Sequence, residues 1–166
     1  MIIVHGDLLD APVKYIAHQV NCQGVMGGGV ALQIKHRYPN VFNEYKEFIK
    51  DYRECNYDEP PLGMAQMCDI PDDINMGLKR YIVNIFGQDQ YGRGKQFTDY
   101  DAVYSAFEDF HDMLIADHGA TWESQVPVAI PYMIGCGLGG GDWNKMTQTL
   151  KRIEKDFNIL FICCEL

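Results

Sequence analysis

Two glycine-rich turns, each between a strand-like run and a helix-like run, constrain the fold of this chain most. The first lies in residues 20–31, VNCQGVMGGGVA, and contains three consecutive glycines. The second lies in residues 130–143, IPYMIGCGLGGGDW. Backbone N–H groups at the start of a helix attract anions, and glycine lets the main chain approach them closely. The two turns therefore predict a backbone cradle for an anionic ligand.

Apolar runs and helical stripes alternate along the chain. This alternation predicts an α/β sandwich with a largely parallel sheet, in which both glycine turns lie at the carboxyl ends of strands, where ligands bind. Polar loops are expected at residues 54–62 and 86–97, and a turn at residues 71–77. The expected strands are residues 2–5, 15–20, 63–70, 80–85, 126–130 and 158–164. The expected helices are residues 30–38, 41–52, a segment from a Thr98 cap to about residue 116, and one from an Asp142 cap to about residue 157.

Composition and charge narrow the class of protein. The 166 residues fit one domain spanning residues 1–166, and 47% of them are apolar. No apolar run reaches the ~20 residues that span a membrane, so we expect no membrane partner. The cysteine pattern favours reduced thiols in a cytoplasmic protein. The net charge of −9 argues against general nucleic-acid binding. The net charge does not exclude a small anionic ligand. Hydrogen bonds from a few N–H groups that point at the ligand outweigh the screened repulsion from distant acidic side chains.

The cysteines and the glycine spacing exclude several other sites. None of the six cysteines forms a C-x-x-C pair or a zinc-like array, so we expect reduced thiols, no metal and no cofactor. Cys163 and Cys164 are adjacent on a predicted strand and should face opposite sides of the sheet. The glycine clusters match neither a P-loop nor a dinucleotide fingerprint.

Three motifs together resemble the macrodomain family. They are Gly6-Asp7-Leu8 after the first strand, HQVNCQGVMGGGVALQIKHRYP from His18, and the second glycine turn. The order and spacing of these three motifs most resemble those of one branch of the family. That branch includes ADP-ribose 1″-phosphate phosphatases and enzymes that remove ADP-ribose from protein or DNA. The resemblance implies a three-layer α/β/α sandwich with a mixed, largely parallel six-stranded sheet. It also implies ADP-ribose or ADP-ribose 1″-phosphate as ligand, with ADP-ribosylated macromolecules as alternative partners.

The resemblance also implies roles for particular residues. Asp7 would accept a hydrogen bond from the adenine amino group, with the Leu8 N–H nearby, although Asp7 could instead only cap a turn. Asn21 would hold the distal ribose and orient the reacting end. The ribose and diphosphate would be held by Gly27, Gly28, Gly29 and Val30 in the first loop and by Ile134, Gly135, Cys136, Gly137, Leu138 and Gly139 in the second.

His18 is the predicted catalytic side chain, because phosphatase-like members of the family carry a histidine at this place. An imidazole titrates near neutrality and can activate water or protonate a leaving oxygen. The alternative is a buried, hydrogen-bonded core histidine. Cys136 is not expected to be a nucleophile, since a thiolate beside bound phosphate is electrostatically disfavoured.

The chain departs from the family at three places. Gln88 or its neighbours stand where DNA- and glutamate-directed members use a lysine, and Gly139 stands where some relatives carry an acid. A tyrosine that lies near the adenine in relatives falls near Cys164. The leading hypothesis is therefore hydrolysis of ADP-ribose 1″-phosphate by water attack. The alternatives are removal of ADP-ribose from protein or nucleic acid, and non-catalytic ADP-ribose binding.

Overall fold

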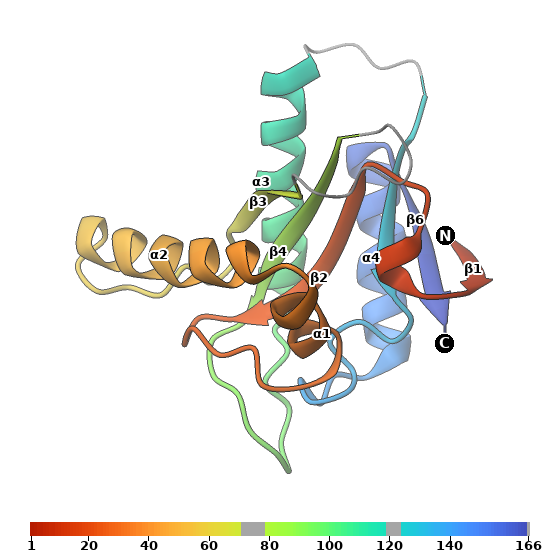
Figure 1. Ribbon diagram of the computed structural model, residues 1–166. Helices are drawn as coiled ribbons and strands as arrows, with labels where there is room; N and C mark the ends of the chain where they lie inside the picture. Colours follow the sequence, from red (N-terminus) through yellow and green to blue (C-terminus); the bar gives the residue numbers. More distant parts are fainter. Residues whose placement is uncertain (71–78, 119–123, 166) are drawn as a thin grey trace.

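A six-stranded sheet forms the centre of the protein. The computed structural model describes residues 1–70, 79–118 and 124–165. The sheet has the order β1-β6-β5-β2-β4-β3, and only the β3–β4 pair is antiparallel (Figure 1). The predicted mixed, largely parallel sheet is therefore confirmed. The strands are β1 (Ile2–His5), β2 (Tyr15–Asn21), β3 (Ala65–Ile70), β4 (Arg80–Gln88), β5 (Val126–Pro131) and β6 (Ile159–Glu165).

Helices cover both faces of the sheet. The helices α1 (Gly29–Arg37) and α2 (Pro39–Cys55) lie on one face (Figure 1). The other face is covered by α3 (Tyr100–His118) and α4 (Trp143–Phe157), which contact each other (Figure 1). A 3-10 turn, η1 (Leu8–Asp10), follows β1. This is the predicted three-layer α/β/α sandwich.

The central strands are apolar because they are buried on both faces. Along β2, Ile16 packs in the core beneath α1 and α2, whereas Ala17 packs in the core beneath α3 and α4. Parallel strands covered by helices on both sides have this near-continuous apolar character. Cys163 and Cys164 lie in these two opposite cores, as expected.

A buried arginine fixes the segment before β2. Arg80 is only 2% exposed and lies at the start of β4. Its guanidinium donates to the carbonyl oxygens of Leu9, Ala11 and Val13 at 3.0, 2.9 and 3.2 Å. These bonds satisfy the buried charge and hold η1 against the sheet.

Two local predictions are wrong. Strand β4 continues through Gln88, where a loop was expected from residue 86, because Phe86 pairs with Val20 and Gln88 with Asn21. Helix α3 is capped by Asp99 rather than Thr98. The Asp99 carboxylate accepts from two N–H groups of the first turn at 3.0 Å, which an N-cap side chain does. The predicted Asp142 cap of α4 is confirmed by a 3.0 Å bond from Lys145 N–H.

The expected turn at residues 71–77 lies outside the described residues. Within the ranges that the structure describes, no helix has the length and apolar character to cross a membrane. The same ranges contain no cluster of three or more side chains suited to a metal ion.

Candidate functional site

A cavity of about 490 Å³ lies at the carboxyl ends of the central strands. Its walls come from three segments that meet at one end of the sheet: the end of β2 with the triple-glycine loop, the β4–α3 loop and the β5–α4 loop (Figure 1). Among the described residues, none of the wall side chains is acidic. Of the predicted site residues, all line the cavity except Asp7, Leu8 and Cys136.

The triple-glycine loop forms one wall and leads directly into α1. Gly28 precedes the helix, and Gly29 begins it with a φ of +55°, a left-handed conformation that favours glycine. A Cβ on Gly28 would lie 2.7 Å from the Leu138 side chain, which comes from the opposite wall. The absence of a side chain at Gly28 therefore lets the two glycine loops touch across the cavity.

The second glycine loop is packed tightly against the start of α3. A Cβ on Gly139 would lie 2.5 Å from the Thr98 hydroxyl and 2.6 Å from the Gly135 carbonyl oxygen. The Gly139 carbonyl accepts from the N–H groups of Phe97 and Thr98 at 2.8 and 3.0 Å. Because the Gly135 carbonyl belongs to the backbone and the Thr98 hydroxyl is hydrogen-bonded to it, a side chain at Gly139 would force this packing to shift.

A polar network that the sequence did not reveal holds this loop. The Gln19 amide donates to Gln88 Oε1 at 2.7 Å and to Thr98 Oγ1 at 2.8 Å. Thr98 in turn donates to the Gly135 carbonyl at 2.7 Å. The Gln88 amide donates to the Gln90 carbonyl at 2.8 Å. Gln88 is thus bonded at both ends of its amide.

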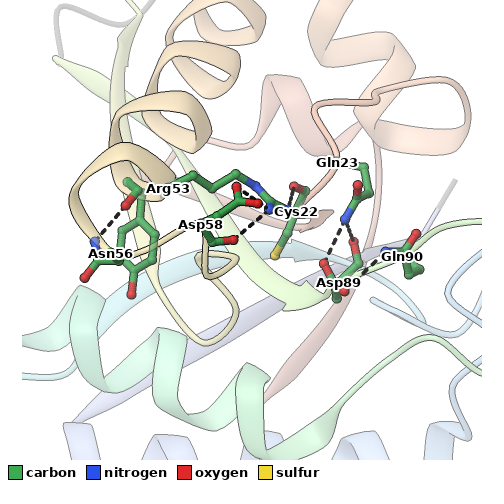
Figure 2. A network of polar contacts seen from close by, with 8 residues as sticks. Cys22, Gln23, Arg53, Asn56, Asp58, Asp89 and Gln90 are labelled. Carbon is green, nitrogen blue, oxygen red and sulfur yellow. Dashed lines mark hydrogen bonds and ion pairs between the residues drawn. The ribbon is translucent and has the colours of Figure 1, made fainter.

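The network in Figure 2 joins the loops that follow β2 and β4. Gln23 Nε2 donates to Asp89 Oδ1 at 2.8 Å (Figure 2). Cys22 N–H donates to the Asp89 carbonyl at 3.0 Å. From the end of α2, Arg53 donates to the Cys22 carbonyl at 3.5 Å and to the Asp58 carbonyl at 2.9 Å. These contacts fix the entry of the triple-glycine loop relative to the β4–α3 loop.

His18 lines the cavity and is almost fully buried, on the face of β2 that α1 and α2 cover. Its Nε2 lies 2.7 Å from Asn84 Oδ1. The Asn84 amide donates to Gln66 Oε1 at 2.9 Å, and the Gln66 amide donates to the Glu44 carbonyl in α2 at 2.9 Å. His18 is therefore hydrogen-bonded and buried, and it also belongs to the cavity wall.

A fixed backbone acceptor sets the tautomer of His18 through two amides. The Glu44 carbonyl can only accept, so Gln66 turns its oxygen to the Asn84 amide, and Asn84 turns its oxygen to His18. Nε2 must then carry the proton, which leaves Nδ1 as a lone-pair acceptor. Within the described part of the chain, Nδ1 is buried and has no hydrogen-bond partner.

Burial also keeps this ring neutral. Desolvation lowers the pKa of His18 from 6.5 to about 4, against a smaller raising effect of the hydrogen bond with Asn84. At neutral pH the imidazole is thus unprotonated at Nδ1. It can accept a proton there.

Asn21 uses most of its side chain to shape its own loop. Its Oδ1 accepts from Gln23 N–H at 2.9 Å and from the Tyr45 hydroxyl at 3.0 Å, and its Nδ2 donates to the Val25 carbonyl at 2.7 Å. One amide hydrogen is left for a ligand. Asn21 lines the cavity.

Asp7, Leu8 and Cys136 lie outside the cavity wall. Asp7 Oδ1 accepts from Leu9 N–H at 2.8 Å and so caps η1, the alternative weighed for this residue. Cys136 is half-buried, and its thiol donates to the Ile134 carbonyl at 3.4 Å. Burial, with a smaller effect of Asp142, raises the pKa of Cys136 to about 11, so this thiol stays protonated at neutral pH.

Curated relatives carry two different activities in their names. The chain is 30% identical over 146 residues to a DNA ADP-ribosyl glycohydrolase of Mycobacterium tuberculosis, which covers 87% of this chain but 36% of that protein. It is 23% identical over 170 residues to an ADP-ribose 1″-phosphate phosphatase of Scheffersomyces stipitis, with 96% and 98% covered. The chain thus spans about a third of the length of the mycobacterial relative.

Solved structures share the fold over nearly the whole chain. The macrodomain of Mycobacterium tuberculosis DarG superposes with a TM-score of 0.72 at 25% identity, covering 99% of this chain and 98% of that chain. Thermosipho africanus DarTG, solved in complex with ADP-ribose, superposes with a TM-score of 0.76 at 17% identity, covering 99% and 42%. The model of the family described as Macro domain matches residues 17–150. Since that match spans most of the chain, the chain belongs to the macrodomain family.

Proposed function

We propose that the chain binds ADP-ribose in this cavity and hydrolyses ADP-ribose 1″-phosphate to ADP-ribose and phosphate. One observation carries the proposal: His18, whose Nδ1 is a buried acceptor without a partner among the described residues, belongs to the wall of a cavity formed by two glycine loops. The names of the relatives support the broader class, a hydrolase acting on ADP-ribose derivatives.

Ligand binding rests on the glycine loops. The triple-glycine loop runs into the first turn of α1, where backbone N–H groups have no partner within the helix. The second loop faces it across the cavity, in contact through Leu138. A diphosphate between them gains roughly 1.5–3 kcal/mol for each charged hydrogen bond. Both loops are already held in place, so little ordering cost opposes binding.

The chemical step uses His18 as a base and then as an acid. A water oxygen bonds to the phosphorus while its proton passes to His18 Nδ1, and the bond from phosphorus to the ribose oxygen breaks. The imidazolium then returns its proton to that ribose oxygen, which regenerates the neutral ring. The nearby phosphate stabilises the imidazolium, because an opposite charge favours the charged form.

Removal of ADP-ribose from a macromolecule is the second candidate, and the similarity to the mycobacterial glycohydrolase favours it. The lysine that DNA- and glutamate-directed relatives use is absent from the cavity wall among the described residues, since Lys95 lies outside it. Gln88, at the corresponding place, is already bonded at both amide ends. We therefore rank phosphate release first.

Calorimetry with ADP-ribose tests binding, and phosphate release from ADP-ribose 1″-phosphate tests the reaction. His18→Gln keeps an N–H donor for Asn84 but removes the base, so we expect a rate loss of about 100-fold with ADP-ribose affinity within about twofold. His36→Gln, at an exposed position on α1, is the matched control.

Equal rates for wild type and His18→Gln would remove His18 from the mechanism. Turnover of ADP-ribosylated DNA or protein alone would select the second candidate, and binding without turnover would select a non-catalytic ADP-ribose binder. Absence of ADP-ribose binding would contradict the whole proposal.

A further inference from the structure

A second hollow of about 380 Å³ adjoins the main cavity. The two share four wall residues: Gly92 and Arg93 from the β4–α3 loop, and Gly137 and Leu138 from the second glycine loop. Because these walls are common, a ligand in the main cavity can extend one of its groups into the hollow.

The hollow is cationic in an acidic protein. Arg93 and Lys95 line it, and among the described residues no carboxylate does, although the chain carries a net charge of −9. Arg37, Arg53 and Arg152 each pair with an aspartate. Over the ranges described, neither Arg93 nor Lys95 forms an ion pair, and the Lys95 ammonium lies 5.0 Å from the Phe97 ring centroid.

The loop that carries these two cations is packed in place. A Cβ on Gly140 would lie 2.5 Å from the Lys95 carbonyl oxygen, so this carbonyl sits directly on the second glycine loop. A Cβ on Gly92 would lie 3.0 Å from the Phe97 ring, and Phe97 N–H donates to the Gly139 carbonyl at 2.8 Å. An anion would therefore meet a cationic site whose backbone is already positioned.

The position of the hollow indicates which part of a ligand reaches it. In the sheet order, β4 lies on the opposite side of β2 from β5, β6 and β1, and Asp7 follows β1. If the adenine lies toward Asp7, as the resemblance to the macrodomain family implies, the distal ribose points toward the β4–α3 loop. A substituent on the C1″ carbon of that ribose then faces Arg93 and Lys95.

We propose that the hollow lined by Arg93 and Lys95 is a subsite for a single phosphate group carried on the distal ribose. A guanidinium and an ammonium suit one phosphate dianion, which Arg93 can bind through two N–H groups. A nucleic-acid strand would need a cationic surface longer than two residues. The net charge of this chain would also repel such a strand. This inference rests on the proposed function and adds selectivity for the phosphorylated ligand.

Calorimetric titration with ADP-ribose and with ADP-ribose 1″-phosphate tests the subsite. All proteins carry His18→Gln, so that turnover does not consume the ligand. With the subsite intact, the phosphorylated ligand should bind more tightly than ADP-ribose. Adding Arg93→Gln and Lys95→Gln together should weaken binding of the phosphorylated ligand by about tenfold or more, and binding of ADP-ribose by less than about twofold. Lys151→Gln, which removes one exposed charge on α4, is the control and should change neither affinity.

Three results would overturn the subsite alone: no loss for either ligand, an equal loss for both, or a loss seen only with an ADP-ribosylated oligonucleotide. The last of these would assign the hollow to nucleic acid instead. Failure of the intact protein to bind ADP-ribose is a separate result. It would overturn the proposed function, and the subsite with it.

Discussion

Acidification should destabilise the protein through His18, and His18→Gln should remove that part of the effect. The pKa of His18 is lowered from 6.5 to about 4 in the fold. Between these values the unfolded chain binds more protons than the folded chain, so the free energy of unfolding falls as the pH falls. From about pH 7 to about pH 5 the two pKa values give a loss of about 2 kcal/mol.

Urea unfolding at the two pH values measures this loss. Carboxylates also titrate in acid, so a change in the wild type alone is not specific to His18. The informative comparison is between the change in unfolding free energy from about pH 7 to about pH 5 in wild type and the same change in His18→Gln. His36→Gln serves as the control, because it removes an exposed histidine. Proton NMR of the His18 ring should show a neutral imidazole down to about pH 5.

The same pH dependence in wild type and His18→Gln would refute the reasoning. A His18 ring signal that titrates near its ordinary pKa would refute it independently. Either result would mean that the buried ring accepts a proton without cost, so that the amide chain from α2 does not hold it neutral.

Three further substitutions have defined outcomes. Gly139→Ala should lower ADP-ribose affinity by about tenfold or more in calorimetry, since its Cβ meets a hydroxyl at 2.5 Å and a carbonyl at 2.6 Å. Arg80→Met leaves the buried carbonyls of residues 9–13 without their donor, and should lower the free energy of unfolding in urea by about 3 kcal/mol. Cys136→Ser should keep the rate of phosphate release within about twofold, because burial keeps this thiol protonated.

The sequence predicted the layers of the fold because local patterns determine them. Apolar runs between helical stripes give buried parallel strands, and glycines between a strand and a helix give turns at the sheet edge. Thr98 and Asp99 are both good capping residues, so the sequence could not decide between them. The extent of β4 was missed because Gly87 and Gln88 are atypical of strands. Gln88 belongs to the strand because it pairs with Asn21 of β2.

The sequence predicted most of the residues that line the candidate cavity, but not the hydrogen bonds that hold its loops in place. The placement of His18 beside the glycine loop followed from the motif. The bonds of Gln19 to Gln88 and Thr98 join residues 69 and 79 positions apart, and no local pattern signals such contacts. Arg93 and Lys95 lay in a segment expected to be a plain polar loop. Their common hollow exists only once that loop packs on the second glycine loop.

The alternation of side chains along β2 places two neighbouring residues in separate layers of the molecule. His18 is linked through amides to α2 on one face, and Gln19 is linked to the second glycine loop on the other. Under the proposed mechanism, a change in the layer behind His18 alters proton transfer without moving the loops, and a change around Gln19 reshapes the loops without touching the imidazole. The proposed catalysis and the proposed ligand affinity can therefore diverge separately in evolution, although they depend on adjacent positions of one strand.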